Sequence, residues 1–227
     1  MASLAGPAPH AASVPFADRR DAGRQLAGWL RQPAGADPVV VALPRGGVPV
    51  AEEIAAALGA PLEVLVVRKL GAPANPEYGV GAIAEGGTRV IDQEITRLLG
   101  IRNGELERTV QAEEEELRRR VRAYRGGAPA PDLSDRTVIL VDDGVATGAT
   151  DVAAARAIRR QRPRRIIAAV PVCSREGYEV LQPEVDEVVA LLVPAGMGAV
   201  SRFYRDFGQV SDQEVIRALH RAPHPSR

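Results

Sequence analysis

The apolar positions of this chain fall into short unbroken runs rich in β-branched residues, separated by segments in which apolar residues recur every three or four positions. Unbroken runs of this length predict strands that are buried on both faces, and the wider spacing predicts amphipathic helices. The predicted strands span 38–44, 62–67, 137–143, 165–172 and 187–194. Their alternation with helices predicts an α/β fold with a doubly wound parallel sheet.

The predicted helices lie before and between these strands. They span 18–32, 48–60, 103–125, 151–161 and about 174–182. Within the long segment, EEEELRRR places each of three Glu residues four positions before an Arg, which is typical of a solvated helix face rather than a catalytic carboxylate pair. Two short apolar stretches flank a Gly-Gly pair between 79 and 92 and predict a hairpin.

Length, charge and cysteine content limit the class of protein. The chain has 227 residues, 29 acidic and 29 basic residues, and one cysteine, Cys173. These values predict one domain over 15–219 between Ala/Pro/Ser-rich tails at 1–14 and 220–227. Zero net charge argues against a nucleic-acid partner, and a lone cysteine excludes an internal disulfide. Because no apolar run is long enough for a membrane span and no secretory signal is visible, we expect a cytoplasmic protein without a membrane partner.

Ligands of parallel α/β sheets bind beyond the carboxyl ends of the strands, which directs attention to the sequences LPRGG, VVRKL and VDDGVATGAT. The loop in the last of these has only small side chains, so its backbone N–H groups can close around an anion. The helix expected near Asp151 would add the positive end of its dipole. Thr147 and Thr150 add hydroxyl donors. We therefore predict a cradle for a phosphate monoester, formed by Gly144, Val145, Ala146, Thr147, Gly148, Ala149 and Thr150.

Asp142 and Asp143 stand directly before this loop. Carboxylates repel a phosphate but accept hydrogen bonds, and two adjacent acceptors suit the vicinal hydroxyls of a sugar. The predicted ligand therefore carries a phosphate and a diol, as ribose 5-phosphate does. Two other interpretations are a Walker B strand, which the absence of any G-K-[ST] sequence disfavours, and a solvated acidic turn.

The segment VILVDDGVATGAT resembles the phosphoribosyl diphosphate (PRPP) signature of the type I phosphoribosyltransferases, and LPRGG resembles their diphosphate loop. DRRDAGRQLA, VRKLGAPANPEYGVGAIAEGG and FYRDFGQVSDQEV extend the resemblance, towards a bacterial subfamily, over most of 16–218. The resemblance implies transfer of the phosphoribosyl group from PRPP to a nucleobase or another small nucleophile, with release of pyrophosphate. It implies diphosphate contacts for Arg45, Gly46 and Gly47, a homodimer, and Mg²⁺ held mainly by PRPP near the two acids.

Arg68 and Lys69, the latter the only lysine in the chain, follow the second predicted strand. That position suits a clamp on the diphosphate, although a pair of surface cations fits the pattern too. The Gly/Pro-rich segment that follows, about 70–90, resembles the flexible lid that family members close over PRPP. Tyr78 and Glu85 in this segment are candidate acceptor contacts, or ordinary loop residues.

The acceptor pocket needs a hood that the core sheet does not supply, and 195–212 is the best candidate. Phe203, Tyr204 and Phe207 cluster there and could either stack on a planar ring or form a packing face. In 6-oxopurine members of the family an aspartate occupies the position of Ala146, which disfavours hypoxanthine and guanine as acceptors. No general base is identifiable from the sequence. A PRPP-binding regulatory protein without transferase activity is the alternative function.

Overall fold

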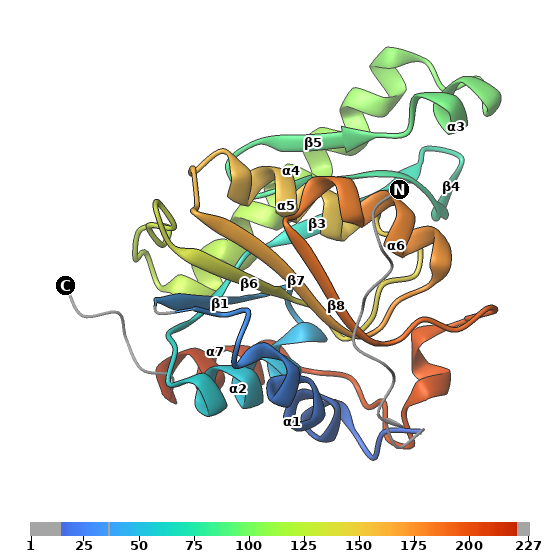
Figure 1. Ribbon diagram of the computed structural model, residues 1–227. Helices are drawn as coiled ribbons and strands as arrows, with labels where there is room; N and C mark the ends of the chain where they lie inside the picture. The colour runs from blue at the N-terminus through green and yellow to red at the C-terminus, as the bar shows by residue number, and fades with distance from the viewer. Residues whose placement is uncertain (1–14, 36, 222–227) are drawn as a thin grey trace.

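The computed structural model describes residues 15–35 and 37–221. Its centre is a sheet of five parallel strands in the order β2-β1-β6-β7-β8 (Figure 1). The strands are β1 (Pro38–Ala42), β2 (Leu62–Val64), β6 (Thr137–Val141), β7 (Arg165–Val172) and β8 (Glu187–Leu192). From β1 the chain proceeds to β2 on one side, and from β6 to β7 and β8 on the other. The crevice between β1 and β6 is therefore the topological switch point of the sheet.

Helices cover both faces of this sheet, as the unbroken apolar strands predict. On one face lie α1 (Arg19–Leu30), α2 (Gly47–Leu58) and α7 (Asp212–Arg221), which pack on alternate strand residues such as Val40 and Ile139 (Figure 1). On the other face lies α5 (Ala149–Arg159), which packs on the intervening residues such as Val39 and Leu140, while α6 (Arg175–Leu181) follows β7. The α/β prediction with a doubly wound parallel sheet is confirmed.

A second sheet is antiparallel and lies across α5 from the first. It consists of β3 (Val67–Ala72), β4 (Asn75–Ala84) and β5 (Thr88–Ile91). The predicted hairpin between 79 and 92 is confirmed, because β4 pairs with β5 around a turn at 85–87. The predicted single strand over 62–67 is wrong. Its apolar run contains the whole of β2 and the first residue of β3, which belong to different sheets.

The remaining elements follow β5, α6 and β8 in the chain. They are α3 (Gln93–Leu98), the long α4 (Asn103–Arg125), and two short 3-10 helices at Gln182–Glu184 and Val200–Phe203. α4 has the bounds that its periodicity predicts and buries Val110, Leu117 and Tyr124. No helix in the described ranges is long and apolar enough to cross a membrane. The predicted tail at 1–14 lies outside the described residues, and α7 continues to Arg221, past the predicted start of the second tail.

Candidate functional site

The loops that follow β1 and β6 meet at the switch point because the two strands are paired in register. Ala42 lies opposite Val141, so the two loops leave the sheet at the same level. Contact is close: a Cβ atom on Gly46 would lie 2.1 Å from Oδ2 of Asp143, and one on Gly47 would lie 2.6 Å from the carbonyl oxygen of Val141. The glycines of LPRGG therefore allow this loop to lie directly against the two acids.

The backbone of the small-residue loop has unsatisfied donors. Within 15–35 and 37–221, no protein atom accepts a hydrogen bond from the N–H groups of Ala146, Thr147 or Gly148. Gly148 has φ +78° and forms the N-cap of α5, which begins at Ala149, two residues before the predicted start. The first N–H groups of α5 have no intrahelical acceptor either, so a run of free donors surrounds the start of this helix. Thr147 is exposed beside them.

Residues after β7 brace this loop from behind. The N–H of Val145 donates to the carbonyl of Val172 at 2.9 Å, and the N–H of Ser174 donates to the carbonyl of Val145 at 2.8 Å. The hydroxyl of Ser174 donates to the carbonyl of Ala146 and accepts from the N–H of Gly177. The loop is thus held in shape without a ligand. Ser174 was not predicted as a site residue, and only its suitability as a helix N-cap marked it in the sequence.

The two acids at the end of β6 have different partners. Oδ1 of Asp142 accepts from the N–H of Asp143 at 2.8 Å, whereas Oδ2 of Asp143 accepts from Nε of Arg19 at 2.7 Å. Burial raises the pKa of both carboxyls, and that of Asp142 well above its usual range because Asp143 and Asp151 add repulsion. Arg19 opposes the rise at Asp143. Asp143 is therefore already paired within the protein, while Asp142 has no cationic hydrogen-bond partner in the described chain.

Asp151 is a third acid at this site that the sequence analysis did not identify. It lies in the first turn of α5 and is only 3% exposed. Burial raises its pKa to about 7, although the hydroxyl of Thr150 donates to Oδ2 at 3.2 Å. Thr150, predicted as a phosphate donor, is thus engaged with this carboxyl. Nothing in the local sequence indicates that the Asp151 carboxyl is buried beside the phosphate cradle, since acids are common in the first turns of helices.

The sequence predicts that Arg68 and Lys69 follow a strand, and this is wrong. They lie within β3, where adjacent side chains point to opposite faces. Lys69 is exposed, and its ammonium opposes the effect of burial on the pKa of Asp142 and of Asp151. Nε of Arg68 instead donates to Glu113 of α4 at 2.7 Å. Lys69 therefore lies within electrostatic reach of Asp142 and Asp151, whereas Arg68 is engaged with Glu113.

Arg45 lies in the predicted diphosphate loop, and the peptide bond between Pro44 and Arg45 is cis. Its guanidinium is 3.7 Å from Oδ1 of Asp212, at the start of α7. The same oxygen accepts from the hydroxyl of Tyr124 at 2.7 Å. In this arrangement the backbone of the loop contacts the acids, and the Arg45 side chain is directed towards α7.

The aromatic residues of the predicted hood pack against the start of the described chain. The ring centroid of Tyr204 lies 5.4 Å from that of Phe16 and 5.0 Å from that of Phe207. The Arg19 guanidinium lies 3.7 Å from the ring centroid of Phe207. The hydroxyl of Tyr204 donates to the carbonyl of Asp143 at 2.5 Å. We call Phe16, Arg19, Tyr204 and Phe207 the hood cluster. It fixes Asp143 by both its backbone and its side chain.

The other predicted acceptor contacts are spread over the molecule. Phe203 is half-buried beside the hood cluster, and Tyr78 is 47% exposed on β4. Glu85 forms an ion pair with Arg125 at the end of α4, so its carboxylate is engaged in joining the β4–β5 turn to that helix. Tyr78, Glu85 and Phe203 lie on three different elements: β4, the β4–β5 turn and the 3-10 helix at Val200–Phe203.

The residues at the switch point fit a magnesium ion only in combination with ligand oxygens. In the described part of the chain, no three His, Cys, Asp or Glu side chains form a group that could hold a metal. Asp142 and Asp143 are hard oxygen donors, and Mg²⁺ is commonly bound by one or two carboxylates together with substrate phosphates and water. These two acids are therefore the residues that could hold the ion.

Comparison with known proteins identifies the family. A model of the phosphoribosyl transferase domain matches residues 17–194, well over half of the chain. The chain belongs to the phosphoribosyl transferase family. Two proteins from two strains of Mycobacterium tuberculosis, provisionally named phosphoribosyl transferases, are each 44% identical to this family member over 207 residues. Those residues are 91% of this chain but 47% of theirs, so the chain spans about half the length of these relatives.

A solved structure of another similar protein supports the fold of this phosphoribosyl transferase domain. The crystal structure of TT1426 from Thermus thermophilus is 46% identical in sequence and superposes with a TM-score of 0.76. The match covers 90% of this chain and 97% of that one. The loop at 144–150 lies within the range matched by the family model, whereas Phe16, Tyr204 and Phe207 of the hood cluster lie outside it.

Proposed function

We propose that this protein transfers the 5-phosphoribosyl group of PRPP to a small nucleophile and releases pyrophosphate, in a Mg²⁺-dependent reaction. The observation that carries the proposal is the run of free N–H groups from Ala146 into the first turn of α5, next to two acids. The donors suit the 5-phosphate, and the acids suit the ribose hydroxyls one step further along the ligand. Family membership supports this assignment.

In this reaction the bond between C1 of the ribose and the diphosphate oxygen breaks, and a bond from C1 to the acceptor nitrogen forms. Negative charge grows on the leaving diphosphate in the transition state. We assign Lys69 to stabilise it, because Arg68 is engaged with Glu113, Arg45 is directed towards Asp212, and the Lys69 ammonium lowers the pKa of Asp142 and Asp151. The close approach at Gly46 and Gly47 allows backbone atoms to line the diphosphate. Mg²⁺ bound with PRPP would supply further neutralisation near Asp142 and Asp143.

For the acceptor we propose a nucleobase other than a 6-oxopurine. Ala146 occupies the position at which 6-oxopurine enzymes of the resembled family carry an acid, and its methyl group is exposed at the loop. A methyl group cannot exchange a proton with a ring nitrogen. An adenine- or uracil-type acceptor is consistent with this position.

A PRPP-binding regulator without transferase activity is the second candidate. It is favoured by the engagement of two of the three predicted diphosphate cations elsewhere, Arg68 with Glu113 and Arg45 with Asp212. A regulator needs only the cradle and the acids to sense PRPP, whereas transfer requires charge stabilisation at the leaving group.

Pyrophosphate release with PRPP, Mg²⁺ and a panel of nucleobases separates the two candidates. Transfer predicts pyrophosphate release with at least one base, and its loss in Lys69→Gln with PRPP binding retained. Thr147→Ala should weaken PRPP binding about tenfold through the lost hydroxyl donor. Thr96→Ala, at a half-buried threonine of α3, is the matched control. PRPP binding without pyrophosphate release for any base would favour the regulator, and no PRPP binding at all would refute both.

A further inference from the structure

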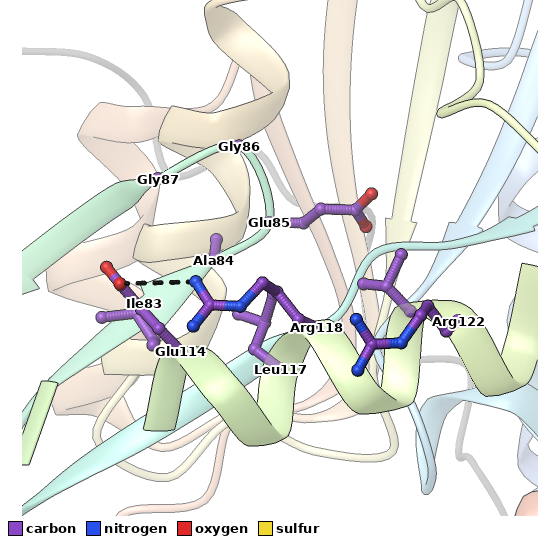
Figure 2. A pocket seen from close by; sticks show the side chains of 10 residues that line it. Ile83, Ala84, Glu85, Gly86, Gly87, Glu114, Leu117, Arg118 and Arg122 are labelled. Atoms are coloured by element: carbon purple, nitrogen blue, oxygen red, sulfur yellow. Dashed lines mark ion pairs between the residues drawn. The ribbon is translucent and has the colours of Figure 1, made fainter. Parts of the chain in front are cut away.

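A cavity of about 380 Å³ lies between the β4–β5 turn and the face of α4 that carries Leu117 and Arg118, and it shares no residue with the phosphate cradle or the hood cluster. Figure 2 shows that its lining comes from two elements, with Ile83 and Ala84 on β4 and Leu117 on α4. The volume lies in the range of pockets that bind small organic molecules. Residues 83–87 of its lining fall within the segment 70–90 that resembles the lid, but the proposed transfer reaction assigns no role to the cavity.

The floor of the cavity is apolar and is formed by Ile83, Ala84, Leu117 and Val121. Its shape is maintained by the Glu85–Arg125 ion pair at one end, where Nη2 of Arg125 also donates to the carbonyl of Val64 at 2.7 Å. In Figure 2 the Glu85 side chain extends away from Arg118. Glu85 is therefore a structural residue at one end of the cavity. The apolar floor favours burial of an apolar or aromatic group.

The rim of the cavity carries positive charge. Arg118 and Arg122 lie one helical turn apart on the same face of α4 and line the cavity together. Arg118 has a loose ion pair with Glu114 at 3.8 Å, but Glu114 is also bound by Arg89 at 2.8 Å. No acid within the described ranges is paired with Arg122. Glu114 also lines the cavity, so Arg118 is partly compensated there and Arg122 is not. The two guanidinium groups can together bracket one oxyanion.

We propose that this cavity binds a small organic anion, with its apolar or aromatic body on the floor and its phosphate or carboxylate between Arg118 and Arg122. A bare inorganic anion would leave the floor uncovered, and a neutral apolar molecule would leave both arginines unused. Nucleoside monophosphates and aromatic carboxylates share the required chemistry. The inference stands apart from the proposed transferase activity.

Titration calorimetry of the parent protein with AMP, UMP and 4-hydroxybenzoate tests the proposal, with inorganic phosphate as the probe that lacks a body. At least one organic anion should bind saturably. The double variant Arg118→Gln/Arg122→Gln should bind it at least about tenfold more weakly, because charge-assisted hydrogen bonds are lost. Arg119→Gln is the matched control, since Arg119 is an exposed arginine of α4 that pairs with Glu116 and does not line the cavity.

Nucleotides could also bind at the phosphate cradle, so Thr147→Ala is measured in parallel. Binding that is weakened by Thr147→Ala and unchanged in the arginine double variant would assign the anion to the cradle and overturn the proposal. Absence of saturable binding by every organic probe, or binding of inorganic phosphate as tight as that of the organic anions, would overturn it too. PRPP binding should be the same in the parent and the double variant. Failure of PRPP to bind the parent would refute the proposed function alone.

Discussion

At the scale of single residues, Asp143 is the most constrained side chain of the candidate site. Arg19 donates to its carboxylate, Gly46 packs against the same group, and Tyr204 donates to its backbone carbonyl. Asp142, one residue earlier, lacks a cation at hydrogen-bonding distance within the described chain. The two neighbouring acids are therefore not equivalent, and we expect Asp142 to be the freer acceptor for a sugar hydroxyl.

Replacing Arg19 with Gln should destabilise the protein by roughly 2–4 kcal/mol, because it leaves a buried carboxylate without its cation. Both side chains of this ion pair are largely buried, at 11% and 14% exposure. PRPP affinity should also fall, since Asp143 loses its fixed orientation. Thermal unfolding and PRPP titration measure the two effects.

Arg20→Gln is the control for this change, because Arg20 is adjacent but half-exposed and pairs with Glu52 and Glu53 of α2. Exposed pairs contribute about 1 kcal/mol or less. Equal losses of stability in the two variants would contradict a special role for the Arg19–Asp143 contact.

Asp151 makes stability depend on pH. Burial raises the pKa of its carboxyl from 3.8 to about 7, so between these values the folded protein retains a proton that the unfolded chain has lost. Stability should therefore fall as pH rises from about 4 to 7, and the full cost above pH 7 is at most roughly 4 kcal/mol. Asp151→Asn should be more stable than the parent at pH 8, and this gain in stability should be much smaller at pH 5. Urea unfolding at the two pH values measures the difference, and a gain independent of pH would contradict the assignment.

At the scale of elements, the site depends on β1 and β6, which end side by side, and on the loops that follow them. These loops touch closely because Gly46 and Gly47 have no side chains. Gly46→Ala tests this contact, because its Cβ would lie 2.1 Å from Oδ2 of Asp143 and 2.6 Å from Cγ. The carboxylate would have to leave Arg19 to make room. We expect PRPP affinity to fall by at least about tenfold, which corresponds to the loss of one charge-assisted hydrogen bond.

Gly28→Ala is the matched control, since Gly28 lies inside α1 and no atom lies within 4 Å of the position its Cβ would take. Alanine there should stabilise the helix by about 0.5–1 kcal/mol and leave PRPP binding unchanged. If Gly46→Ala binds PRPP like the parent, the two loops do not need this close contact.

Elements with a strong local signal were predictable from the sequence. The bounds of α4 follow from its 23-residue apolar stripe, and β7 from an uninterrupted apolar run. The division between β2 and β3 was not predictable, because the apolar run from Leu62 to Val67 contains no Gly, Pro or Asn to mark a break. This error placed Arg68 and Lys69 together at a strand end, whereas alternation within β3 separates them.

The candidate site was predictable to the extent that it is local. The acids, the small-residue loop and the glycines of LPRGG are each contiguous in the sequence, and the register of β1 with β6 brings them together. The hood cluster was not predictable in this form, because Arg19 lies 124 positions before Asp143 and Phe16 contacts Tyr204 from the other end of the described chain. The prediction left open whether Tyr204 stacks on a ligand or packs internally, and its ring lies against Phe16.

At the scale of the whole molecule, the site is assembled from both ends of the described chain, so ligand binding should stabilise the entire domain. At 100 times its dissociation constant, a ligand specific for the folded state adds about 2.7 kcal/mol. For a domain of this size that corresponds to an increase in melting temperature of about 5–10 °C. PRPP with Mg²⁺ should produce this shift in thermal unfolding, and chelation of the ion should reduce it. An unchanged melting temperature at saturating PRPP would contradict binding at the cradle.

The Arg19–Asp143 pair also has a consequence for the order in which the protein can form during translation. Arg19 leaves the ribosome 124 residues before its carboxylate partner, which at common elongation rates is a delay on the order of ten seconds. Tyr204 and Phe207 emerge later still. In a nascent chain the guanidinium of Arg19 in α1 therefore lacks its carboxylate partner during that interval. A chaperone that recognises cationic amphipathic helices would have access to α1 throughout.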